Sequence, residues 1–182
     1  MLQVTIPAAD LYDERNNEFI TTDEQVLSLE HSLASLAKWE SKWCKPFLSE
    51  EKMTEEESID YIRCMSLTQD VPPDVYRVIP NDVISEISDY IAKPMTATWF
   101  SEESKKGRKN NGKRVTAEII YHWMIALQVP PEYEFWHLNR LLTLIRVCDE
   151  ENKPQKKKSA KNLMSEYAAL NMARRQKLNT KG

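Results

Sequence analysis

Glycine is nearly missing from this chain. Its 182 residues contain three, at Gly107, Gly112 and Gly182. Loops that cradle phosphate groups need glycines so that backbone N–H groups can approach the ligand closely. Neither a P-loop nor a dinucleotide fingerprint can be assembled from these three positions. The sequence therefore argues against a nucleotide cofactor and the common kinds of nucleotide-dependent chemistry.

Cysteine and histidine are scarce as well, with three of each. The cysteines are odd in number and form no CxxC pair, which is typical of proteins from a reducing compartment. No HExxH motif is present. A zinc site built from His122, His137 and Cys148 is one alternative. The other is that the histidines are hydrogen-bonded within the pair of predicted helices or are half-exposed. Since no catalytic constellation emerges, we expect neither a metal nor a cofactor, and no enzymatic activity.

The sequence also has no long apolar run. No stretch approaches the roughly 18–20 residues that cross a bilayer. The first 14 residues show neither the basic region nor the apolar core of a signal peptide. We therefore expect a cytoplasmic protein that makes no contact with a membrane.

Charge is present in quantity but unevenly distributed. Residues 153–182 carry nine Lys or Arg and one acid, Glu166, which gives this segment a net charge of +8. Because the whole chain has a net charge of −3, the first 152 residues carry −11. An acidic body followed by a basic tail indicates a tail that engages a partner.

Hydrophobic periodicity predicts a short β segment followed by helices. Residues 2–6 alternate like a strand that stops at Pro7, and residues 18–21 and 25–30 read as a hairpin joined by a polar turn at Thr22–Asp23. Helical spacing and caps predict two helices that begin after Ser32 and Thr54, the second with a Thr54–Glu57 capping box. Further helices are predicted from Asn81 to before Pro94 and over 116–129, 132–152 and 160–178.

The segment 116–129 is apolar on nearly every side, which predicts a buried helix. It is expected to pack antiparallel to 132–152 across a short Pro-Pro connection. Asn139 and Arg140 on the latter helix form either a ligand site or a buried hydrogen-bond network. Residues 95–100 are short and β-prone. Residues 105–114 carry six Lys or Arg and read as a solvated loop, with nucleic-acid contact as the alternative.

These patterns together predict a mainly α protein: a small N-terminal β-hairpin, then a compact helical domain of about five helices, then a C-terminal basic helix. Residues 1–152 are expected to form one globular domain. Residues 153–182 are expected to form a basic linker and a helical arm.

Two features are candidates for protein binding. Trp39 and Trp43 lie one helical turn apart and extend an apolar stripe through Leu36, Leu33 and Leu29. We expect Trp43 to pack inside the domain and Trp39 to lie at the edge of the stripe, where it contacts a partner. The second candidate is the basic helix, whose partner-facing residues would be Leu163, Met164, Tyr167, Leu170, Arg174 and Arg175.

Several blocks of the sequence resemble a family of tail assembly chaperones encoded by long-tailed (siphovirus-type) bacteriophages and prophages. The resemblance spans nearly the whole chain, with weaker agreement over 101–114. The blocks that carry it are "LEHSLASLAKWESKWCKPFL", "SIDYIRCMSLTQDV", "PMTATWF", "AEIIYHWMIALQVPPEYEFWHLNRLLTLIRVC" and "LNMARRQKLNTKG".

The resemblance implies a non-catalytic protein of the host cell cytoplasm that binds the tape-measure protein. Such chaperones keep the long helical tape measure soluble and promote assembly of tail-tube subunits around it, and many have a longer form made by ribosomal frameshifting. Two alternatives remain. One is a structural component of the virion, such as a head–tail connector or tail-completion protein. The other is a nucleic-acid-binding phage regulator that uses 105–114 and the C-terminal lysines.

Overall fold

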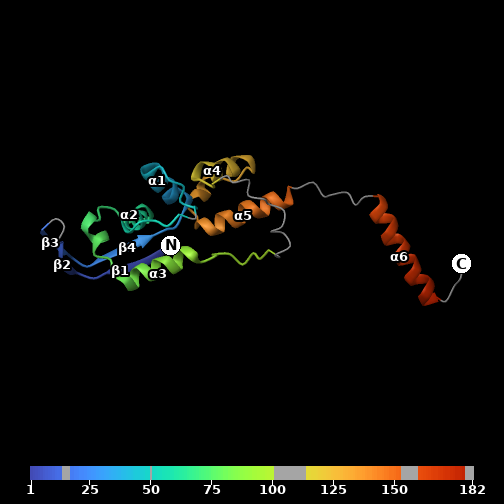
Figure 1. Ribbon diagram of the computed structural model, residues 1–182, viewed down its shortest axis with the longest axis horizontal. Coiled ribbons are helices and arrows are strands. Elements are labelled where there is room, and N and C mark those ends of the chain that lie inside the picture. Colours follow the sequence, from blue (N-terminus) through green and yellow to red (C-terminus); the bar gives the residue numbers. More distant parts are fainter. Residues whose placement is uncertain (14–16, 50, 101–113, 153–159, 179–182) are drawn as a thin grey trace. The chain divides into compact units, whose positions relative to one another are not determined.

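A computed structural model describes the chain except for residues 14–16, 50, 101–113, 153–159 and 179–182. The chain separates into two compact units, Met1–Asp149 and Glu150–Gly182. The predicted basic loop at 105–114 lies outside the described residues except for Arg114, and the predicted linker at 153–159 lies outside them too. The described part is mainly helical with β-hairpin strands at the N-terminus, as the sequence predicts (Figure 1).

Four short strands open the chain, and they pair in two nested sets. β1 (Leu2–Ile6) pairs antiparallel with β4 (Gln25–Leu29), and β2 (Ala9–Asp13) pairs antiparallel with β3 (Glu18–Thr22). The β1 strand ends before Pro7, as predicted. The registers set Leu2 opposite Leu29 and Asp13 opposite Glu18.

The predicted pairing of the second and third extended stretches is wrong. β3 and β4 are successive segments that bond to β2 and β1 respectively, and Asp23–Glu24 between them does not reverse the chain. The physical reason lies in the core face of the first sheet. Pairing β1 with β4 sets Val4 opposite Leu27, and both side chains are then buried on the same side of the ladder.

Two helices follow, and both start as predicted. α1 (Leu33–Trp43) begins at Ser32, whose hydroxyl accepts a hydrogen bond from the backbone of Ser35. α2 (Glu55–Met65) begins at Thr54 with the predicted Glu57 capping box. The outer edge of β4 is covered by the end of α2 and the residues after it, because the backbone of Leu67 donates to Ser28.

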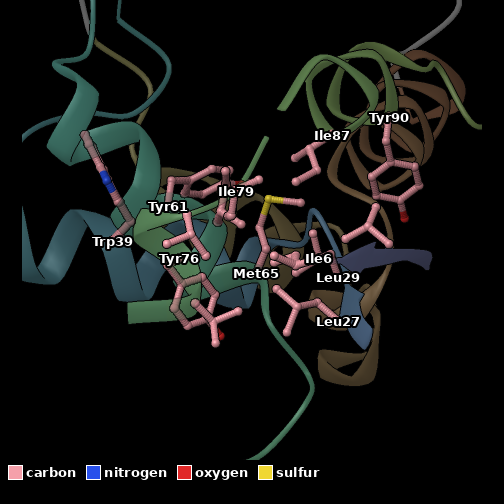
Figure 2. Packing of buried hydrophobic residues seen from close by; sticks show 14 residues of the cluster. Ile6, Leu27, Leu29, Trp39, Tyr61, Met65, Tyr76, Ile79, Ile87 and Tyr90 are labelled. Carbon is pink, nitrogen blue, oxygen red and sulfur yellow. The ribbon is translucent and has the colours of Figure 1, made fainter. Parts of the chain in front are cut away.

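The first hydrophobic cluster lies between the β1–β4 ladder and the helices α1, α2 and α3 (Asn81–Ala92), with the short helix η1 (Pro73–Arg77) at its side (Figure 2). Its centre holds side chains with little or no exposed surface. These are Ile6, Leu27, Leu29, Trp39, Tyr61, Met65 and Ile87.

A second cluster joins α1 to α4 (Ala117–Ala126) and α5 (Leu138–Glu151). Leu33 and Leu36 of α1 meet Ile120, Met124 and their neighbours there. The prediction that α4 is buried all round is wrong, because the side chain of Ile125 is 76% exposed. One face of α4 is enough to fill the space that α1 and α5 leave.

The helix predicted over 132–152 begins later than expected. A short helix, η3 (Pro131–Phe135), comes first, and α5 starts at Leu138, whose backbone donates to the carbonyl of His31 at 2.7 Å. The β-prone stretch 95–100 forms neither a strand nor a helix. The C-terminal helix, α6 (Ala160–Leu178), agrees with the prediction.

Candidate functional site

The predicted partner-binding residues of α6 lie on a helix whose described side chains are all exposed. Met164, Tyr167 and Leu170 are more than half exposed, and Arg174 and Arg175 follow one to two turns later. The side chain of Leu163 lies outside the described set. Met172 and Leu178, which the sequence prediction did not include, are exposed as well. This helix therefore presents both apolar and cationic groups to solvent.

Trp39 does not lie at the edge of the α1 stripe, so its predicted role as a partner contact is wrong. Its side chain is 1% exposed, and its indole Nε1 donates to the carbonyl of Glu57 at 2.9 Å. Phe47 and Tyr61 meet the ring edge-on. Figure 2 shows Trp39 among the buried side chains of the first cluster. Helix α2 and Phe47 cover the position that the sequence pattern left open.

Trp43 is the more accessible of the two tryptophans. Its ring lies 6.3 Å from that of Trp39, centroid to centroid, and it is only partly buried. Its indole Nε1 donates to Asp60 Oδ2 on α2 at 2.9 Å, and the ammonium group of Lys42 bonds the other carboxylate oxygen of Asp60. The tryptophan thus fixes a charged pair at the surface between α1 and α2.

A hollow of about 340 Å³ lies beside this pair. The residues that line it come from two helices, Lys38 and Lys42 from α1 and Asp60, Arg63 and Cys64 from α2. Burial raises the pKa of the half-buried Cys64 thiol, and Asp60 raises it further, while the three cations lower it. Three cations and one carboxylate therefore act on one small volume.

The neighbouring end of α1 holds a second charged arrangement. Lys45 hydrogen-bonds the buried carboxylate of Glu57, and this bond holds the pKa of Glu57 below its usual value. Glu40 is also buried, and its two oxygens accept hydrogen bonds from the backbone N–H groups of Phe47 and Ala117, each at 2.7 Å. Glu40 therefore ties the start of α4 to α1.

That arrangement borders a second hollow, of about 320 Å³, which includes Cys44. The thiol of Cys44 is exposed at the C-terminal cap of α1. Its recorded contact is with the backbone carbonyl of Ser41, at 3.9 Å.

Two histidines meet in the interior. The rings of His31 and His137 lie 5.1 Å apart and both side chains are nearly fully buried. His31 Nδ1 is hydrogen-bonded to the hydroxyl of Tyr61, and His137 Nε2 bonds the carbonyl of Tyr90. Burial, reinforced by His137, lowers the pKa of His31 to about 4, and burial also lowers the pKa of His137.

Asn139 takes part in a hydrogen-bond network, and within the described part of the chain Arg140 does not. The Asn139 amide donates to the carbonyls of Ile91 and Lys93, which end α3. Arg140 is exposed and its guanidinium lies 4.0 Å from the centre of the Trp136 ring. Asn139 therefore has a structural role, because it caps the C-terminal end of α3.

The structure brings no three His, Cys, Asp or Glu side chains of the described residues together as a metal site needs. His122 is exposed on α4, whereas His137 is buried beside His31. Within the same part of the chain, no helix combines the length and apolar character of a bilayer crossing.

Sequence reasoning missed several exposed apolar side chains of the first unit. Phe19 and Trp99 are each 82% exposed, and Ile125 and Phe135 are mostly exposed. Phe19 packs against Tyr12 across the β2–β3 ladder. The alternation of β3 places Phe19 on one face of a two-stranded ribbon, but nothing in that alternation predicts that the face stays uncovered.

The sequence contains only a weak indication of the hollow between α1 and α2, which the sequence analysis did not predict. Lys38 and Lys42 recur one turn apart on α1, which predicts that they share a face. The position of α2 beside that face could not be read from the sequence.

No family model matches the chain, and no curated protein or solved structure matches it either.

Proposed function

We propose that this protein is a tail assembly chaperone of a long-tailed bacteriophage. It is a non-catalytic protein that binds the tape-measure protein and promotes assembly of the tail tube. The observation that carries the proposal is helix α6, whose described apolar side chains are all exposed and interspersed with cations. The family resemblance of the sequence supplies the identity of the client.

The physical argument concerns what such a helix binds. Met164, Tyr167 and Leu170 follow i, i+3 spacing, which puts them along one side of α6. Exposed apolar side chains in such a row are typical anchors for a partner helix. A tape-measure protein is a long helical molecule, and shielding its apolar stripes is what a chaperone of this kind does. Arg174 and Arg175 attract acidic segments of a client toward the helix.

Co-expression with the tape-measure protein of the same phage genome tests the proposal. The full chain should keep the tape measure soluble and co-purify with it. A variant that carries Tyr167→Asp and Leu170→Asp should lose both effects. A matched control, Ser165→Asp with Ala169→Asp, adds the same charge at two helix positions opposite the Met164, Tyr167 and Leu170 row and should retain both effects.

Purified virions separate the proposed chaperone from a structural component of the particle. A chaperone leaves before the particle is complete, so mass spectrometry of virions should not detect this chain. Its presence in a ring-like copy number would replace the chaperone by a connector or tail-completion protein.

A further inference from the structure

The hollow between α1 and α2 carries more positive charge than its own residues neutralise. Lys38 and Lys42 lie one turn apart on α1, and Arg63 lies in the last turn of α2. The one lining carboxylate, Asp60, is bonded to Lys42 and to the indole of Trp43. The charge of Asp60 is therefore balanced by Lys42.

The other two cations have no such balance. Within the described part of the chain, neither Lys38 nor Arg63 has an ion-pair partner, and both side chains are exposed. The hollow thus has a surplus of two positive charges. Its position is held rigidly, because Trp39 and Trp43 of α1 bond to Glu57 and Asp60 of α2.

We propose that this hollow binds an acidic side chain of a protein partner, with Lys38 and Arg63 holding the carboxylate. A guanidinium group matches a carboxylate in a two-pronged hydrogen bond, and a lysine ammonium adds a second charge from the opposite wall. The identity of the partner as a tail protein rests on the proposed function. The anion site itself does not.

The charge around the hollow favours an acidic side chain over a nucleic acid. Residues 1–152 carry a net charge of −11. At physiological salt, charges act over about 8 Å, so a single carboxylate in the hollow is dominated by the cations beside it. A nucleic acid strand extends well beyond that distance, so it experiences the net negative charge of residues 1–152. The hollow gathers three cations, whereas a nucleic acid strand is bound along a track of many.

The half-buried thiol of Cys64 reports on occupancy. Lys38, Lys42 and Arg63 lower its pKa, so an anion that offsets these cations raises it. A bound side chain also covers the thiol. Both effects slow the reaction of Cys64 with iodoacetamide, which modifies the thiolate. A protein with Cys44→Ser and Cys148→Ser leaves Cys64 as its one cysteine.

The test measures this alkylation rate at low salt with three probes: a blocked tetraglutamate peptide, the matching tetraglutamine peptide and a short oligothymidylate. Tetraglutamate should slow alkylation, and tetraglutamine should not. Replacing Lys38→Gln or Arg63→Gln should weaken protection by tetraglutamate about threefold each, and both together about tenfold. The control, Lys52→Gln with Lys93→Gln, removes two exposed lysines outside the hollow and should leave protection unchanged.

Three results would overturn the site: no protection by tetraglutamate, equal protection by tetraglutamine, or full protection in the Lys38→Gln, Arg63→Gln variant. Stronger protection by oligothymidylate than by tetraglutamate would assign the hollow to nucleic acid instead. The readout contains no tape-measure protein. Failure of the site and failure of the chaperone function are therefore separate results.

Discussion

The two tryptophans of α1 differ in their contribution to stability: Trp39 is part of the hydrophobic core, whereas Trp43 is partly buried and bonds to Asp60. Replacing each of them separately measures the two contributions. Trp39→Ala removes a side chain that is 1% exposed and packs against Phe47 and Tyr61. Truncating a buried aromatic residue of this kind costs about 3–5 kcal/mol. Since domains unfold with about 5–15 kcal/mol, the variant should lose a large part of its stability. Trp39→Phe keeps most of the packing but loses the bond to Glu57, which should cost about 1–2 kcal/mol.

Trp43→Ala is the matched comparison. It removes a half-buried ring and one hydrogen bond to Asp60, which keeps Lys42 as a partner. We expect a loss of about 1–2 kcal/mol. Urea unfolding followed by circular dichroism at 222 nm measures all three variants, with the urea dependence checked for a common slope. If Trp43→Ala destabilises the protein as much as Trp39→Ala does, the division of roles between the two rings is refuted.

Three further predictions concern buried polar groups. The pKa of His31 falls from 6.5 to about 4 on folding, so between these pH values the unfolded chain binds a proton that the folded chain does not. The unfolding free energy is therefore unaffected by this group above pH 6.5 and decreases as the pH falls from 6.5 toward 4. By pH 5 the decrease should reach about 2 kcal/mol. Unfolding at several pH values should show this slope for wild type and for His122→Gln, an exposed control, but a flatter one for His31→Gln; a flat wild-type curve would contradict it. Glu40→Gln puts an amide donor against one of the two backbone N–H groups that Glu40 accepts from, and should cost about 1–3 kcal/mol in urea unfolding, whereas an unchanged midpoint would mean that the carboxylate does not secure α4. Among the described residues Thr22 Oγ1 is buried without a hydrogen-bond partner, so Thr22→Val should be neutral or stabilise by about 1 kcal/mol, and a clear loss in thermal unfolding would reveal a partner for this hydroxyl.

Local signals in the sequence were enough for most of the helices. Ser32 and Thr54 cap α1 and α2 because their hydroxyls satisfy free N–H groups in the first turn, and this depends on residues three positions apart. Pro94 follows the end of α3 for an equally local reason, since proline cannot continue a helix. Such features are readable because both partners lie within one turn of chain.

The errors concern partners that lie far apart in the sequence. The pairing of β4 with β1 joins residues 19 to 27 positions apart, and a hairpin between neighbouring stretches was the simpler prediction. The burial of Trp39 depends on Glu57 and Tyr61 of α2, which no spacing within α1 can report. The hollow between α1 and α2 was missed for the same reason. Its cations are visible in the sequence, but their convergence follows from helix packing.

The structure confirms the helix on which the candidate residues of α6 lie, and their role in binding a partner stays a prediction. Met164, Tyr167 and Leu170 recur at helical spacing, and this pattern is local. The identity of the partner does not follow from this pattern, because a row of apolar side chains indicates that a helix is bound but not which protein carries it.

The proposed function is that of a chaperone that binds the tape-measure protein through α6. The most direct measurement is co-purification of the tape-measure protein with the full chain and with the Tyr167→Asp, Leu170→Asp variant. The account predicts a soluble complex with the full chain and its loss in the variant, while the Ser165→Asp, Ala169→Asp control keeps the complex. An insoluble tape measure and no co-purification with the full chain would contradict the account.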